Sequence, residues 1–175
     1  VYGRGGTGSR YLARLWRTRG YILVIQDTRG MGGSEGKAKA FADDGWAGER
    51  QDGADTIAWV KQQPWCNGMI ATSGGSALGL VQVLMAPATK DIKAQSISVA
   101  ASNFYGQLSY EGGVFRKSLC EDWLTAQGVP YMIDVWHGHP TYDAFWTEYN
   151  AESQAQNVNA PAIHIGGWWD IFGQG

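Results

Sequence analysis

The chain alternates between short continuous apolar runs and longer segments in which apolar residues recur every three or four positions. The continuous runs are rich in Ile, Val and Ala, as is typical of buried parallel strands. They lie at residues 21–26, 68–72, 92–101 and 161–166. The segments with helical spacing lie at residues 11–19, 52–63 and 78–85. This succession predicts an α/β fold with an open, mostly parallel sheet and helices on both faces.

Residues 103–159 have a different texture, rich in Tyr, Trp, Phe and Gly and without alternation of strand and helix. We interpret them as a helical cap inserted over the top of the sheet. The predicted organisation is therefore a first part of the core at 1–102, the cap at 103–159 and a return to the core at 160–175. Because the chain lacks an initial Met and stops in a turn-like segment, we expect a piece of a longer protein.

Composition narrows the classes of protein further. With 175 residues, 44% of them hydrophobic, only 17% charged and a net charge of -2, the chain can bury a proper core. No basic run offers a surface for nucleic acid, no apolar run approaches the ~20 residues that span a bilayer, and no signal peptide is visible. Two cysteines, Cys66 and Cys120, cannot build a disulfide framework, and we expect both to be free.

The sharpest local signal is a glycine-flanked serine between a predicted strand and a predicted helix. The letters GGSALG occupy positions 74–79, so that Ser76 stands at the turn. A strand that turns directly into a helix can hold a serine strained and exposed, beside free N–H groups at the helix start. The second glycine, Gly79, comes one residue later than in the usual G-x-S-x-G pattern. An idle serine and a phosphate-binding loop remain alternatives, although no Lys follows as in a P-loop.

Several motifs accompany this turn in a fixed order. They are DTRGMGGSEG at 27–36, DGADTIAW at 52–59, QPWCNG at 63–68, HPTYDAFW at 139–146 and GGWWDIF at 166–172. Together with the serine turn they resemble the cocaine esterase / X-prolyl dipeptidyl-peptidase family of α/β-hydrolases, also called CocE/NonD hydrolases. The resemblance runs along nearly the whole chain.

The resemblance implies a role for five residues. Ser76 matches the nucleophile and Asp170 the acid of a catalytic triad. The hydroxyl of Tyr2 and the backbone N–H of Ala77 match the oxyanion hole, and Phe172 matches an aromatic residue of the acyl pocket. We also expect Trp169, next to the acid, to line that pocket. A serine needs a base to become nucleophilic, and a carboxylate must orient that base.

The base itself is not evident. In α/β-hydrolases the histidine follows the acid, and no histidine follows Asp170. We expect His137, His139 and His164 to be structural and the catalytic histidine to lie C-terminal to residue 175. His137 and His139 could bind a metal ion only with a third and a fourth ligand, and we expect no metal site there. Asp27 and Arg29 are expected to form an ion pair that fixes their loop.

The expected activity is hydrolysis of an ester or acyl bond by a serine hydrolase. In the resembling family, one subgroup that hydrolyses α-amino acid esters has acidic residues just after the triad acid, where they hold the substrate ammonium group. Here Ile171, Phe172 and Gly173 occupy that stretch, so the resemblance favours an esterase over an X-prolyl dipeptidyl-peptidase or amidase. A non-catalytic α/β binding module is the alternative of another class. We expect a small ester, amide or peptide as partner, and no cofactor, metal, nucleic acid or membrane. Cytoplasmic and exported locations in a bacterium both remain open, as does the oligomeric state.

Overall fold

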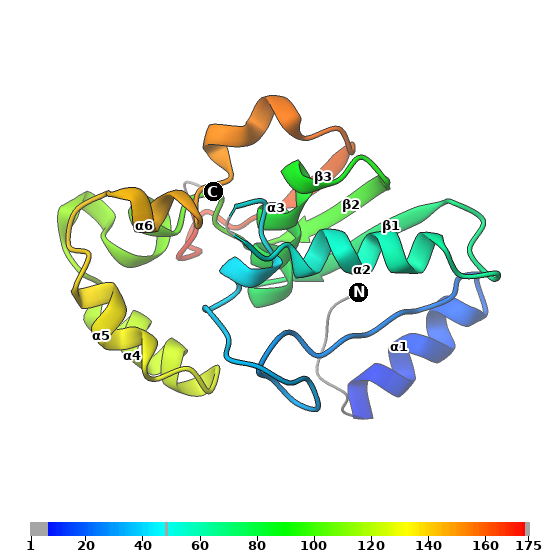
Figure 1. Cartoon of the computed structure of the whole chain (residues 1–175), viewed down its shortest axis with the longest axis horizontal. Helices are drawn as coiled ribbons and strands as arrows, with labels where there is room; N and C mark the ends of the chain where they lie inside the picture. The colour runs from blue at the N-terminus through cyan, green and yellow to red at the C-terminus, as the bar shows by residue number, and fades with distance from the viewer. Residues whose placement is uncertain (1–6, 48, 174–175) are drawn as a thin grey trace.

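The computed structural model describes residues 7–47 and 49–173 and is built around a small parallel sheet (Figure 1). Its strands are β1 (Ile70–Gly75), β2 (Ile92–Ser98) and β3 (Ala162–Ile165), in the order β1-β2-β3. Gly75 pairs with Ser98, and Ser98 pairs with Ile165. The carboxyl ends of the three strands are therefore level, and the segments that follow them emerge at one edge.

Three helices match the predicted helical segments. They are α1 (Thr7–Arg17), α2 (Asp52–Lys61) and α3 (Ala77–Met85). α2 carries Asp52 and Asp55 in its first turn and Lys61 in its last, which complements the helix dipole. α3 packs directly on β1 and β2, and α2 lies against α3. This parallel arrangement with a helix between β1 and β2 confirms the predicted α/β class.

The predicted strand at residues 21–26 is wrong, because this segment forms no strand. A strand needs a hydrogen-bonded neighbour, and among the described residues the sheet contains only β1, β2 and β3. The side chains of Tyr21, Ile22 and Leu23 instead line a cavity of about 530 Å³ that reaches β1. The pattern of apolar residues does not specify a partner strand, which this segment lacks.

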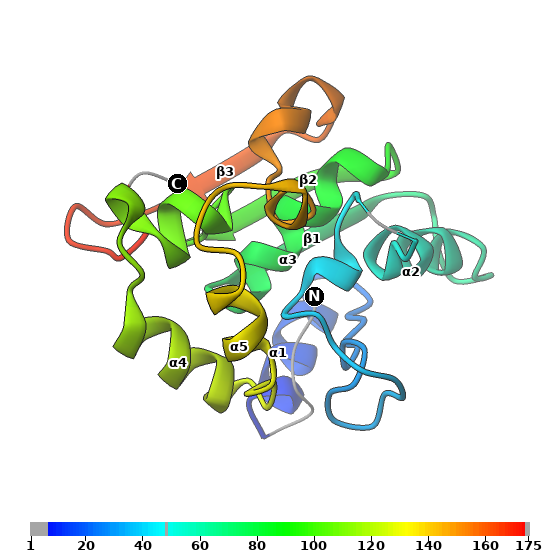
Figure 2. The same ribbon diagram turned by 60° about the vertical axis from the view of Figure 1, so that its left-hand side comes forward.

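The segment between β2 and β3 is helical, as predicted. Residues 117–137 lie together at a distance from the strands, whereas the last helix, Glu152–Asn157, lies near β3 (Figures 1 and 2). The segment comprises the π-helix Tyr105–Ser109, the short helix Glu111–Gly113, α4 (Lys117–Ala126), α5 (Met132–His137), α6 (Ala144–Thr147) and the 3-10 helix Glu152–Asn157. Its start is joined to a later part of the same segment by an antiparallel bridge between Asn103 and Asn150. The Ala151 N–H also donates to the Ser102 carbonyl at 2.8 Å. The domain limits at 102 and 159 stay a prediction.

An aromatic cluster fills the interior of this helical segment. Trp136, Trp146, Tyr149 and Phe104 are all fully buried. Trp146 Nε1 donates to the His139 carbonyl at 2.8 Å, whereas Trp136 Nε1 is buried without a hydrogen-bond partner. Tyr149 Oη donates to the Lys39 carbonyl at 2.6 Å. The last bond joins the helical segment to the loop that precedes α2, so the two parts share one core.

The two cysteines, Cys66 and Cys120, are free, as expected. Burial raises the pKa of the Cys120 thiol to about 11. Within the described ranges, no helix is both long enough and apolar enough to cross a membrane.

Candidate active site

Ser76 occupies a strained turn at the carboxyl end of β1. Its backbone angles are φ 53° and ψ -126°, in a region that non-glycine residues seldom enter, and α3 starts at the next residue. The side chain is exposed. Strain of this kind persists only where the surrounding structure fixes the backbone, and such positions cluster at functional sites.

The glycines of the turn allow strand and helix to cross closely. A Cβ atom at Gly74 would lie 2.5 Å from the Cβ of Leu78. At Gly79 it would lie 2.8 Å from the Cβ of Ala100 and 3.0 Å from the Ser98 carbonyl oxygen. The late position of Gly79 therefore has a physical reason, because this residue faces the chain at the end of β2.

Backbone hydrogen bonds hold the turn from both sides. The Ser76 N–H donates to the Ser98 carbonyl at 3.0 Å, and the Ser76 carbonyl accepts from Gly79 at 2.8 Å and Leu80 at 2.9 Å. Ala77 is the first residue of α3, where a backbone N–H has no acceptor within the helix. Tyr2, the other residue predicted for an oxyanion hole, lies outside the described residues.

Asp170 lies in the loop after β3, where it organises a turn. Its backbone N–H donates to the Gly167 carbonyl at 3.0 Å, and its Oδ1 accepts from the Phe172 N–H at 2.9 Å. Phe172 is buried in the core, which anchors the loop. Trp169, by contrast, is 99% exposed, and its place in a substrate pocket stays a prediction. Trp168 is 97% exposed as well.

The fold brings Ser76 and Asp170 to the same edge of the sheet, because they follow β1 and β3 and the ends of these strands are level. Between them, Val99 follows β2 with φ 45°, an unusual value for a β-branched residue. The loop of Asp170 is also tied to the helical segment, since Arg116 Nη1 donates to the Ile171 carbonyl at 3.3 Å.

The three histidines have other surroundings. His137 Nε2 lies 3.3 Å from Glu121 Oε1, and His139 Nδ1 lies 2.6 Å from Asp143 Oδ2. The hydrogen bond from His139 lowers the pKa of Asp143. His164 belongs to β3 and is exposed. Within the described part of the chain, no three His, Cys, Asp or Glu side chains are grouped to hold a metal ion.

A buried polar network beneath the turn was missed from the sequence. Gln82, Gln95 and Thr72 are 1%, 4% and 6% exposed and bond to one another. Gln82 also donates to the carbonyls of Gly74 and Leu78, at 3.2 and 3.0 Å. The signal available in the sequence was a single amide in the otherwise apolar helix α3, whose other buried residues are glycine or aliphatic.

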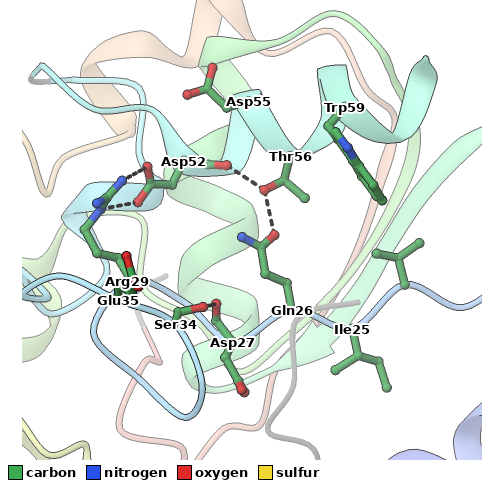
Figure 3. Close-up of a pocket in the computed structure, with 11 residues that line it drawn as sticks. Ile25, Gln26, Asp27, Arg29, Ser34, Glu35, Asp52, Asp55, Thr56 and Trp59 are labelled. Carbon is green, nitrogen blue, oxygen red and sulfur yellow. Dashed lines mark hydrogen bonds and ion pairs between the residues drawn. The ribbon is translucent and has the colours of Figure 1, made fainter. Parts of the chain in front are cut away.

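A cavity of about 680 Å³ lies apart from the turn, between α2 and the loop after residue 24 (Figure 3). Arg29 binds Asp52 there through two hydrogen bonds of 2.7 and 2.6 Å, which raise the pKa of the guanidinium. The predicted pairing of Arg29 with Asp27 is thus corrected: Asp27 instead accepts from the Gly33 N–H at 2.9 Å. Both residues do fix their loop, as expected.

Two buried acids lie close to this ion pair. Asp43 and Asp44 are 4% and 1% exposed, and one carboxylate oxygen of each has no hydrogen-bond partner. Burial, with the nearby charges of Asp52 and Asp43, raises the pKa of Asp44 to about 7, against the opposing effect of Arg29. Asp44 therefore retains a proton in the folded protein over a range where an exposed carboxyl group is ionised.

Known proteins share both the sequence pattern and the fold. The chain is 27% identical over 201 aligned positions to the cocaine esterase of Rhodococcus sp. (strain MB1 Bresler), covering 87% of this chain and 34% of that protein. A CocE/NonD family hydrolase from Staphylococcus aureus superposes with a TM-score of 0.66 at 22% identity, over 76% of this chain and 25% of the other. An aminopeptidase from a marine sediment Thaumarchaeota archaeon gives a TM-score of 0.66 at 21% identity, over 91% and 34%.

These structures identify the fold as a partial α/β-hydrolase fold. The chain spans about a third of the length of the cocaine esterase. The sequence model of the family described as X-Pro dipeptidyl-peptidase (S15 family) matches residues 2–132 and 124–175 of this chain. These two matches extend over nearly the whole sequence, as the motifs at 27–36 and 166–172 led us to expect, and the chain therefore belongs to the X-Pro dipeptidyl-peptidase (S15) family.

Proposed function

We propose that this chain carries the nucleophile and the acid of a serine hydrolase that cleaves ester or acyl bonds through an acyl-enzyme at Ser76. The observation that carries the proposal is the backbone of Ser76, held at φ 53° between β1 and α3 with its side chain exposed. A strained serine at such a turn presents its hydroxyl to a substrate above the sheet. Membership of the family supports the same function.

In the proposed reaction, Ser76 Oγ attacks the carbonyl carbon of the substrate while its proton passes to a histidine. The tetrahedral oxyanion is stabilised by the Ala77 N–H at the start of α3 and by the Tyr2 hydroxyl. When the intermediate collapses, the leaving alcohol takes the proton from the histidine and the acyl group stays on Ser76. Water, deprotonated by the same histidine, then releases the carboxylic acid and restores the serine.

Asp170 is the proposed partner of that histidine, since it emerges at the same sheet edge as Ser76. We place the histidine itself C-terminal to residue 175. His137 pairs with Glu121 and His139 pairs with Asp143, so we assign both histidines a structural role in the helical segment. The greater length of the cocaine esterase, of which this chain covers 34%, supports the same assignment.

The surroundings of Asp170 favour an ester over a peptide with a free N-terminus. The next three residues are Ile171, Phe172 and Gly173, and Phe172 is buried in the core. None of them offers a carboxylate to a substrate ammonium group. An X-prolyl dipeptidyl-peptidase is the second candidate, because the matching family model bears that description.

The proposal is tested by reacting the full-length protein with a fluorophosphonate probe and measuring its intact mass. Ser76 Oγ should displace fluoride and form one bond to phosphorus, so that the mass rises by one probe. Ser76→Ala should abolish this gain. Ser118→Ala, which removes an exposed hydroxyl on α4, serves as the matched control and should be labelled like the wild type.

Absence of labelling in the wild type, or unchanged labelling of Ser76→Ala, would favour a non-catalytic binding module. Substrates then separate the two enzymatic candidates. Short acyl esters should be hydrolysed faster than an X-Pro dipeptide amide with a free N-terminus, and the opposite order would make the peptidase the better assignment.

A further inference from the structure

We propose that Gln82 is a positioning residue, whose carboxamide holds the backbone on both sides of Ser76 in the geometry needed for attack. This inference rests on the proposed function, because it concerns the nucleophile of the same site. Gln82 does not touch the substrate. It acts through the turn that carries Ser76.

The carboxamide of Gln82 bonds to the backbone on both sides of Ser76. Gln82 Nε2 donates to the Gly74 carbonyl at 3.2 Å and to the Leu78 carbonyl at 3.0 Å. Gly74 and Leu78 stand two residues before and two residues after Ser76. A single side-chain amide therefore links the last residues of β1 to the first turn of α3, directly beneath the nucleophile.

The remaining contacts fix which way the amide faces. Thr72 Oγ1 donates to Gln82 Oε1 at 2.7 Å, so the NH₂ end of the amide is turned toward the carbonyls of the turn. Gln95 Nε2 in turn donates to Thr72 Oγ1 at 3.3 Å and to the Gln82 backbone carbonyl at 3.3 Å. In this series of hydrogen bonds, each donor polarises the next one. Because all three side chains are buried, water does not compete for the same acceptors.

The turn needs such a support because its own chain is pliable. Gly74 has no side chain, and glycine is the residue whose backbone is least restricted. The bond from Ser76 N–H to Ser98 fixes the turn toward β2, and the bonds to the Ser76 carbonyl fix it toward α3. Gln82 supplies the connection that these bonds lack, between β1 and α3 themselves. Without it, Ser76 can relax from φ 53° toward an ordinary backbone conformation.

The test compares Gln82→Met with Gln95→Met in the full-length protein, using the rate of labelling by the fluorophosphonate probe. Methionine keeps the length of glutamine but offers no donor. Both variants lose buried hydrogen bonds and should unfold at lower urea concentration than the wild type. Gln82→Met should also lower the labelling rate at saturating probe at least about ten-fold, with the half-saturating probe concentration unchanged within about two-fold. Gln95→Met should retain that rate within about three-fold, since its amide reaches the turn only through Thr72 and the backbone of Gln82.

A second variant covers the case in which Gln82→Met does not fold. In Gln82→Glu, the protonated carboxyl group can donate to a carbonyl of the turn, whereas the carboxylate cannot. The labelling rate of this variant relative to the wild type should therefore fall as the pH rises from about 5 to about 9. A ratio that does not change with pH would overturn the proposal.

Labelling of Gln82→Met within about two-fold of the wild-type rate would also overturn it, as would equal slowing by Gln95→Met. These results differ from a failure of the proposed function, which would appear as an unlabelled wild-type protein or a labelled Ser76→Ala variant.

Discussion

Replacing Asp44 by asparagine should stabilise the folded protein at neutral and alkaline pH. Asp44 is 1% exposed and its Oδ1 has no hydrogen-bond partner. Burial and the charges of Asp52 and Asp43 raise its pKa from an ordinary value of 3.8 to about 7. Above that pH the folded protein must hold a buried, poorly solvated carboxylate, which the unfolded chain exposes to water.

The sign and size of the effect follow from this difference. Below about pH 4 the carboxyl group is protonated in both states and contributes nothing. Between pH 4 and pH 7 the folded state binds more protons than the unfolded state, so the free energy of unfolding falls as the pH rises. Because a tenfold change in an acid's dissociation constant is worth about 1.4 kcal/mol, the loss reaches up to about 4 kcal/mol and is constant above pH 7.

Urea denaturation of the wild type and Asp44→Asn at about pH 4.5 and pH 8 measures this contribution. The variant should be more stable by up to about 4 kcal/mol at the higher pH and by about 1 kcal/mol or less at the lower. Asp122→Asn, which changes an exposed carboxylate on α4, controls for the general effect of removing a negative charge. A stability gap between Asp44→Asn and the wild type that is the same at both pH values would refute this reasoning, as would a variant less stable at pH 8.

Two further substitutions test the packing. Gly79→Ala places a Cβ atom 2.8 Å from Ala100, so it should lower the free energy of unfolding by about 1–3 kcal/mol. Gly106→Ala, where nothing lies within 4 Å of the added atom, should change the free energy of unfolding much less. Equal urea midpoints for the two variants would contradict the close crossing of strand and helix at Gly79. Trp146→Ala removes a fully buried ring and should destabilise the protein by about 3–5 kcal/mol in the same assay. A loss below about 1 kcal/mol would mean that the aromatic cluster does not support the fold.

The helices of the fold could be predicted from the sequence, whereas the pairing of strands could not. The helix expected at 52–63 appears as Asp52–Lys61, and the one expected at 78–85 as Ala77–Met85, because helical spacing is a property of residues close together in the sequence. The run at 21–26 forms no strand, since pairing depends on a neighbour that the spacing of apolar residues does not specify.

The same division holds for the candidate site. The strained turn at Ser76 could be expected from its flanking glycines and is present in the structure, whereas the catalytic roles of Ser76 and Asp170 stay predictions. Contacts between residues far apart in the sequence could not be predicted. Arg29 binds Asp52 rather than its near neighbour Asp27, and the pKa of Asp44 depends on how deeply the tertiary fold buries it.

The two tryptophans next to Asp170 make this loop an optical reporter. Trp168 and Trp169 are 97% and 99% exposed, whereas rings such as Trp136 and Trp146 are fully buried. Water-soluble quenchers such as iodide should therefore reach the emission of the first pair and spare that of the second. Any molecule or segment that covers the loop of Asp170 should shield this emission and shift it to shorter wavelength, without a label having to be introduced.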